Sequence, residues 1–205
     1  MKHRCLDVMV FALLLAGCAA EPMTLATSQV DLNHDGRLAT VSLQLVSGRR
    51  YDDTDLWCGM GKKVEGKFAV VVSVEGKQTT TSLNQFYPDR GTLWFGDGSF
   101  DLVFQDYTQD GRAEFNLGQY GSCGGWDYRL FAIDPNGAVS LLPGPEINSA
   151  DTANSTRELA VDHGLITTHY YYVDHAGPRT AVYQWDKAKG AFNLVKDVSD
   201  DGAAN

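Results

Sequence analysis

The chain has 205 residues, of which 43% are hydrophobic and 21% charged, so it can bury a core and does not have the composition of a disordered protein. Its 26 acidic residues outnumber its 17 basic ones, and the formal net charge of −9 argues against a nucleic-acid binder, which must neutralise phosphates. The 21 glycines and 11% aromatic residues favour strands joined by turns.

The amino terminus has the three-part layout of a secretory signal. Lys2 and Arg4 precede an apolar run from Val8 to Leu15, which is too short to cross a bilayer core of about 30 Å as a finished helix. The run ends in Leu15-Ala16-Gly17-Cys18, which resembles the lipobox of bacterial lipoproteins, where cleavage before the cysteine is accompanied by lipidation of its thiol. An ordinary cleaved signal that contains a cysteine is the alternative.

We therefore predict a signal peptide over residues 1–17 and a lipidated tether over residues 18–24. Ala19, rather than an aspartate, follows Cys18, which in bacterial lipoproteins implies sorting to the outer membrane, on its periplasmic face. No second apolar segment approaches about 20 residues, so the lipid would be the membrane anchor.

Runs of β-branched and aromatic residues alternate with turn residues along the rest of the chain. The last three of these runs are expected to form a three-stranded meander. The predicted strands are Val41–Val46, Phe68–Val74, Thr79–Leu83, Phe100–Phe104, Tyr128–Ile133, Val139–Leu142, Leu165–Val173, Thr180–Trp185 and Phe192–Val195.

Three turn segments indicate hairpins. In Asp134-Pro135-Asn136-Gly137 the proline presets the turn and the glycine accepts a positive φ; Val74–Lys77 and Asp186–Gly190 are similar links. The expected fold is all-β, an antiparallel meander of hairpins in one small propeller-like or curved-sheet domain over residues 25–198, with a barrel as a further way to close it. Residues 145–157 are expected to form a long loop, and 199–205 a flexible tail.

Two cysteines remain once the signal is removed and Cys18 carries lipid. An exported chain passes through an oxidising space, so we predict a disulfide between Cys58 and Cys123. In the chain-entropy model such a bridge stabilises the fold by about 4 kcal/mol. Two unpaired buried thiols are the alternative.

Two segments share the pattern of a calcium loop: Asp31-Leu32-Asn33-His34-Asp35-Gly36 and Asp106-Tyr107-Thr108-Gln109-Asp110-Gly111. Both place oxygen-bearing side chains at positions 1, 3 and 5 and glycine at position 6. A hard cation takes roughly six to eight oxygen ligands, and alternating positions of a tight loop point inward while the glycine permits the turn. The glutamate that closes an EF-hand at position 12 is absent, since Ser42 and Leu117 occupy that place.

The second loop has Glu114 at position 9, where the first has Ala39. This arrangement resembles the calcium loops of VCBS and FG-GAP repeats, which link strands of β-propellers. We expect the better site, with structural rather than catalytic calcium, at Asp106, Thr108, Asp110, the Arg112 carbonyl and Glu114. A weak or empty second site is expected at Asp31, Asn33, Asp35 and the Arg37 carbonyl. Asx-type turns without a metal are the alternative for both loops.

Signals for an enzyme are weak. Gln119–Trp126 has a passing likeness to the papain nucleophile region, but that thiol needs a helix start where we predict a strand. Three evenly spaced histidines would bind a transition metal only on one unbroken strand: His163, His169 and His175. Three carboxylates are available for glycoside cleavage, although a solvated acidic loop is the simpler interpretation: Asp52, Asp53 and Asp55. We expect no catalytic activity.

The segment Phe104–Gly121, continued by Tyr128-Arg129-Leu130-Phe131, resembles a family of calcium-binding periplasmic lipoproteins. These serve as immunity proteins against peptidoglycan-cleaving toxins of antibacterial type IV secretion systems. The likeness extends over residues 65–142. It implies inhibition of a lysozyme-like hydrolase, and it assigns calcium ligation to Asp106, Thr108, Asp110 and Glu114.

A second fragment, Ser47-Gly48-Arg49-Arg50-Tyr51, is similar to the Ser-Gly-x-x-Tyr loop that bacterial lysozyme inhibitors insert into the enzyme's cleft. The two arginines could pair with carboxylates there, and Tyr51 would be the aromatic anchor. A chance match in a turn at the end of a strand is the alternative.

Together these features predict a periplasmic, lipid-anchored, calcium-stabilised protein that binds and blocks a peptidoglycan hydrolase. An acidic body suits a basic partner, because complementary charge speeds the encounter. Two other functions stay open: a calcium-dependent envelope adhesion or scaffold module without inhibitory activity, and a wall-active hydrolase.

Overall fold

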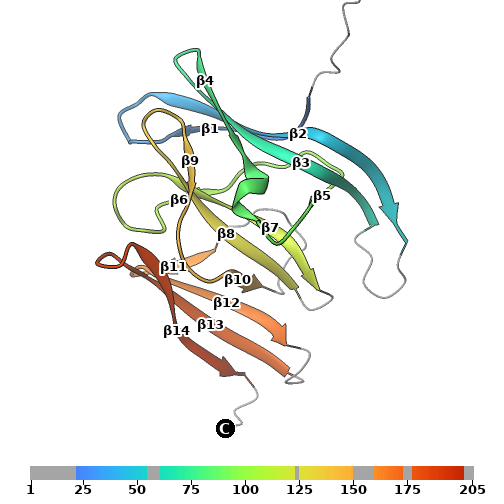
Figure 1. Ribbon diagram of the computed structural model, residues 1–205. Coiled ribbons are helices and arrows are strands. Elements are labelled where there is room, and N and C mark those ends of the chain that lie inside the picture. Colours follow the sequence, from blue (N-terminus) through green and yellow to red (C-terminus); the bar gives the residue numbers. More distant parts are fainter. Residues whose placement is uncertain (1–21, 55–60, 123–124, 150–158, 173–176, 201–205) are drawn as a thin grey trace, which may run out of the picture.

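The computed structural model describes residues 22–54, 61–122, 125–149, 159–172 and 177–200, which contain fourteen strands and one short 3₁₀ helix (Figure 1). The predicted signal peptide, the predicted lipidation site Cys18 and the predicted bridge between Cys58 and Cys123 lie outside the described residues. Among the described residues, no helix has the length and apolar character needed to cross a bilayer.

Three antiparallel sheets follow one another along the chain. Sheet A has the order β1-β2-β3-β4, and β5 lines the same edge of β3 as β4 does. Its strands are β1 (Met23–Asp31), β2 (Leu38–Asp53), β3 (Gly61–Val74), β4 (Lys77–Ser82) and β5 (Leu93–Gly96), with the 3₁₀ helix η1 (Leu83–Phe86) after β4.

Sheet B has the order β10-β8-β7-β6, with β9 paired to β8, and sheet C has the order β11-β12-β13-β14. The strands of sheet B are β6 (Phe104–Gln105), β7 (Glu114–Ser122), β8 (Gly125–Ile133), β9 (Val139–Leu141) and β10 (Ile147–Ser149). Those of sheet C are β11 (Ala160–Asp162), β12 (Leu165–Tyr172), β13 (Gly177–Asp186) and β14 (Ala191–Ser199).

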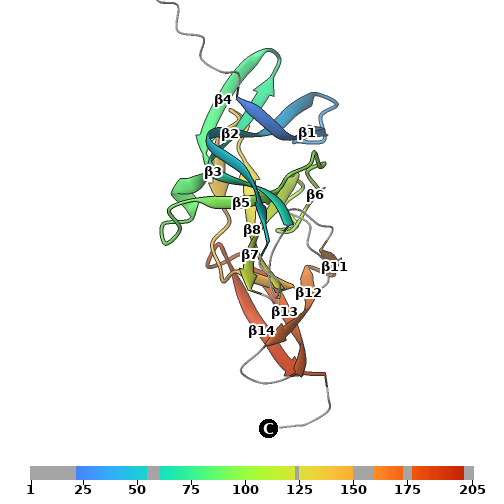
Figure 2. The ribbon, with the colours of Figure 1, turned by 90° about the vertical axis from the view of Figure 1, so that its right-hand side faces the viewer.

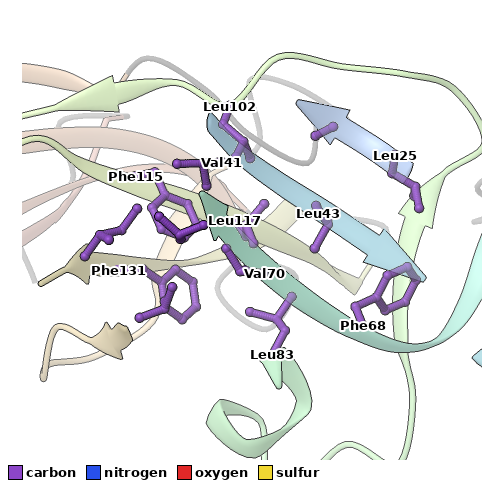
Figure 3. Close-up of a cluster of buried hydrophobic side chains, with 14 of the residues drawn as sticks. Leu25, Val41, Leu43, Phe68, Val70, Leu83, Leu102, Phe115, Leu117 and Phe131 are labelled. Atoms are coloured by element: carbon purple, nitrogen blue, oxygen red, sulfur yellow. The ribbon is translucent and has the colours of Figure 1, made fainter. Parts of the chain in front are cut away.

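Sheet B is the middle of three layers, as both views show (Figures 1 and 2). Its central strand β8 contributes to a core on each face, because successive side chains of a strand point to opposite sides. Phe131 and Ile133 of β8 join the first core with sheet A, whereas Tyr128 and Leu130 join the second core with sheet C. Figure 3 shows part of the first core, in which Phe115 and Phe131 stack with their ring centroids 5.3 Å apart.

The predicted all-β meander is confirmed, and so are its three hairpins. β8 pairs with β9, β3 with β4, and β13 with β14, and the last three strands form the expected meander. Gly137 and Gly76 adopt φ of 83° and 81°, the left-handed conformation for which glycine was expected in these turns. The described strands form no closed barrel.

Two expected elements are wrong. Most of Phe100–Phe104 is not a strand: Phe100 forms only an isolated bridge with Ala26 of β1, Leu102 donates its N–H to the side-chain hydroxyl of Ser28 over 2.8 Å, and only Phe104 enters β6. The expected loop over residues 145–157 contains β10, which pairs with β8 because Ile147 is buried in the second core.

The ends of the fold also differ from expectation. β1 begins at Met23, so two residues of the expected tether are paired, Met23 with Leu45 and Thr24 with Gln44. At the other end Asp200 donates its N–H to the carbonyl of Pro178 over 2.9 Å, so the expected tail is ordered as far as that residue.

Candidate metal centre

The second aspartate loop connects the two strands of a hairpin, β6 and β7. β6 and β7 pair Gln105 with Glu114, which leaves residues 106–113 as the loop. The Asp106 carboxylate accepts the N–H of Asp110 over 3.0 Å and that of Gly111 over 2.9 Å. Gly111 has φ of 85°, as the predicted sharp turn requires. Asp106 thus holds the loop in the shape in which alternate residues converge.

Glu114 closes this loop from β7 and is 1% exposed. Its carboxylate accepts the N–H of Tyr107 over 2.7 Å, the N–H of Thr108 over 3.0 Å and the Thr108 hydroxyl over 2.6 Å. Burial raises the pKa of Glu114, and the three hydrogen bonds oppose that rise without cancelling it. Among the described residues no cationic side chain forms an ion pair with Glu114, so a bound cation would supply the charge that this buried carboxylate lacks.

Oxygens of Asp106, Asp110 and Glu114 lie within 4.8 Å of one another. Oxygens that share one calcium at about 2.3–2.6 Å can be at most about 5 Å apart, so this spacing fits a calcium-sized ion. Thr108 belongs to the same cluster through its bond to Glu114. The donor set is hard oxygen throughout, the chemistry that calcium prefers. The residues present therefore fit the expected ion.

Arg112 lies beside this cluster and forms three hydrogen bonds to Asp110. Its Nε and Nη2 donate to Oδ2 over 2.9 Å and 2.5 Å, and its main-chain N–H donates to Oδ1 over 3.0 Å. The guanidinium hydrogen bond is the main cause that lowers the pKa of Asp110. Oδ2 thus accepts two hydrogen bonds, whereas Oδ1 accepts one and keeps a lone pair for an ion. Arg112 keeps Asp110 charged and reduces the net negative charge around the cluster.

The first aspartate loop repeats this backbone arrangement. Asp31 accepts the N–H of Asp35 over 3.0 Å and that of Gly36 over 2.7 Å, and Arg37 bonds Asp35 as Arg112 bonds Asp110. The loops differ where Glu114 closes the second one. Ala39 has the equivalent place and is 2% exposed in the first core, so it offers no ligand. In the described part of the chain, only the second loop gathers three acidic side chains.

The two loops touch each other. Ala113 donates its N–H to the carbonyl of Leu32 over 3.2 Å, and both residues are buried. Leu32 is at position 2 of the first loop, and the same position of the second loop holds Tyr107, which is 0% exposed. The sequence interpretation missed the role of position 2, although an apolar or aromatic side chain inside a polar loop is a signal for it.

Ser47–Tyr51, expected as a partner-binding loop, lies within β2 instead. Every residue of the segment is paired with β3, from Ser47 opposite Lys67 to Tyr51 opposite Lys63. Gly48 makes this pairing possible, because a Cβ there would lie 2.0 Å from the carbonyl oxygen of Glu65. Because Ser47–Tyr51 is polar, the sequence did not indicate that it belongs to a strand.

The side chains of this segment form ion pairs and ring contacts. Arg49 lies 3.3 Å from Glu65, and Arg50 lies 2.8 Å from an oxygen of Asp97. The Tyr51 ring has the Arg49 guanidinium 4.9 Å and the Lys63 ammonium 4.6 Å from its centre. Arg49 and Arg50 remain 72% and 62% exposed. The segment is thus rigid, cationic and accessible.

The weaker enzyme candidates are not brought together. His163 lies in the turn between β11 and β12, His169 lies within β12, and His175 is outside the described residues. The one unbroken strand that a metal site at these histidines would require is therefore not formed, because a turn separates His163 from β12. Asp53 is paired with Lys63 at 2.9 Å rather than placed in a free acidic loop.

No family model matches this chain, and a search of curated proteins finds no match either.

Proposed function

We propose that the protein is a calcium-stabilised lipoprotein of the bacterial envelope that binds and inhibits a peptidoglycan hydrolase. The observation that carries the proposal is the convergence of Asp106 and Asp110 on the buried Glu114. These residues lie inside the block, residues 65–142, that resembles calcium-binding immunity lipoproteins. The charge, the export signal and the cationic segment of β2 agree with the same function.

Calcium would act in this protein as a structural ion. Asp106, Asp110, Glu114, Thr108 and the Arg112 carbonyl would hold it, and it would compensate the buried negative charge. An ion that binds only the native state at a hundredfold excess over its dissociation constant stabilises that state by about 2.7 kcal/mol. The first loop, which has Ala39 in place of an acid, would bind more weakly.

The partner-binding surface would be centred on Arg49, Arg50 and Tyr51. In the described part of the chain, β1 covers the edge of β2 only as far as Leu45, so the edge from Ser47 to Asp53 is open. Tyrosine and arginine are the residue types that dominate binding energy at protein interfaces. A strand presents them with less ordering entropy than a flexible loop would. The arginines would face the carboxylates of the hydrolase cleft, and the acidic remainder would favour a basic enzyme.

The lipobox-like Leu15–Cys18 and the absence of an aspartate after it support a lipid anchor on the periplasmic face of the outer membrane. Such a location would place the inhibitor between incoming hydrolases and the peptidoglycan. The disulfide between Cys58 and Cys123 would form in the same oxidising compartment.

The test of inhibition is the clearing of a cell-wall suspension by a lysozyme-type hydrolase, with the mature chain added in increasing amounts. An inhibitor slows clearing in proportion to the amount added and stops it near equimolar ratio for tight binding. A scaffold module leaves the rate unchanged, and a hydrolase clears the suspension without added enzyme. The variant Arg49→Glu/Arg50→Glu should lose inhibition, whereas Lys196→Glu on the exposed face of β14 should retain it.

A further inference from the structure

We infer that Tyr107 couples cation occupancy of the loop over residues 106–114 to the packing of sheet C against sheet B. The inference rests on the proposed calcium site and adds a role for a residue that is not a ligand. It concerns the second core, which joins the two sheets through buried side chains that include Tyr107, Tyr128, Ile166 and Tyr183.

Tyr107 is the one loop residue that belongs to this core. Its N–H donates to Glu114 over 2.7 Å, so the main chain of Tyr107 is tied to the carboxylate that would hold the ion. Its hydroxyl accepts a hydrogen bond from the Asn116 amide over 2.7 Å, and Asn116 is 0% exposed. Two residues of β7 thus fix Tyr107 at both ends, and its ring is buried in the second core, to which sheets B and C both contribute side chains.

A second contact joins the same loop to sheet C. The Gln109 side chain lies against the turn between β11 and β12, where a Cβ on Gly164 would be 2.9 Å from the amide oxygen of Gln109. Gly164 has φ of 77°, so this turn depends on glycine in its conformation as well as in its size. The loop therefore meets sheet C from inside the core through Tyr107 and from outside through Gln109.

The coupling has a direct physical basis. An ion bound to Glu114 would fix the carboxylate and, through its hydrogen bond, the main chain of Tyr107. Without the ion, the uncompensated buried charge favours opening of the loop, and opening would withdraw a ring from the second core. Because coupling between two equilibria is reciprocal, a weaker attachment of sheet C must also lower the affinity of the loop for calcium.

Hydrogen exchange of the mature chain, with and without calcium, tests the first half of the inference. Calcium is expected to slow exchange in the loop and also in β12 and β13, which contain no proposed ligand. Exchange in β3 and β4 should change much less. Slowing confined to the loop, with calcium bound, would overturn the coupling and leave the calcium site intact.

Calorimetry of calcium binding tests the second half. Gln109→Ala and Ile166→Val are mild changes outside the ligand set, and each should weaken calcium affinity several-fold. Val70→Ala, in the first core, is the matched control and should leave the affinity unchanged. In the hydrogen-exchange experiment, Tyr107→Phe keeps the ring and should retain the slowing of exchange in β12 and β13 by calcium. Tyr107→Ala should lose that slowing. Equal affinities for all these variants would refute the coupling; no calcium uptake by the wild type would refute both the coupling and the proposed site.

Discussion

The Thr108 hydroxyl donates to Glu114 over 2.6 Å at a place from which water is nearly excluded, since the two residues are 9% and 1% exposed. This bond and two main-chain hydrogen bonds satisfy the carboxylate as an acceptor but do not neutralise it. A buried charge without a counter-charge destabilises a fold. The stability of the loop is therefore expected to depend strongly on whether the charge of Glu114 is removed or compensated.

Replacing Glu114 with glutamine removes the charge and nearly keeps the shape. Without calcium, Glu114→Gln should be more stable than the wild type at neutral pH. Burial raises the pKa of Glu114 in the folded state, so the wild type is destabilised relative to the glutamine variant as pH rises through the ordinary value of 4.5 towards the raised one. Urea unfolding at several pH values, with calcium chelated, would measure the difference. A constant difference over this pH range would contradict the prediction.

Calcium should raise the melting temperature of the wild type, and Asp110→Ala should remove that rise. The expected loss corresponds to about 2.7 kcal/mol at a hundredfold excess of the ion over its dissociation constant. Asp35→Ala is the matched control, because Asp35 makes the same bonds to Arg37 in a loop that lacks a closing acid. Thermal unfolding of both variants, with and without calcium, would measure the rise in melting temperature that calcium causes in each. An equal loss in the control would contradict the prediction, because it would show that the first loop contributes as much to the calcium effect as the second.

Gly48→Ala should destabilise the protein by about 1–3 kcal/mol or more, because the added Cβ would overlap the Glu65 carbonyl of the paired strand. Gly91→Ala is the control: a Cβ there meets nothing within 4 Å, and no positive φ is required. Chemical unfolding of both variants measures the difference. Equal stabilities would show that the close pairing of β2 with β3 at this point is wrong.

The charge reversal Arg49→Glu/Arg50→Glu should abolish inhibition of the hydrolase and change stability little. Both side chains are mostly exposed, and exposed ion pairs contribute about 0–1 kcal/mol. An inhibition assay measures the loss of binding to the hydrolase. Thermal unfolding serves as the control, because it shows whether the variant is still folded. Full inhibition by a folded variant would exclude this segment as the partner-binding surface.

Features encoded by neighbouring residues could be predicted from the sequence. The turn at Asp134–Gly137 and the convergence of Asp106, Asp110 and Glu114 depend on spacing within a few residues. β1 escaped prediction because a bulge between Thr24 and Ala26 interrupts its alternation and buries Leu25 and Ala26 together.

Features that depend on residues far apart in the sequence could not be predicted from local spacing. Phe100–Phe104 has the composition of a strand, but the hydroxyl of Ser28 in β1, 74 residues from Leu102, accepts the hydrogen bond that a main-chain carbonyl would accept in a regular strand pair. Likewise, no local pattern shows that Tyr107 enters a core shared with Ile166. Ser47–Tyr51 reads as a turn because its polar residues lie in a strand with little apolar alternation.

Each sheet is complete before the next one begins: sheet A ends at Gly96, sheet B spans Phe104–Ser149, and sheet C starts at Ala160. Most strand pairs therefore join neighbours within one segment of the chain, so each sheet can form without waiting for a later segment. A chain exported amino terminus first would release its sheets into the new compartment in the order in which they stack. Each arriving sheet would find its packing surface already formed, which shortens the time for which apolar faces are open to aggregation.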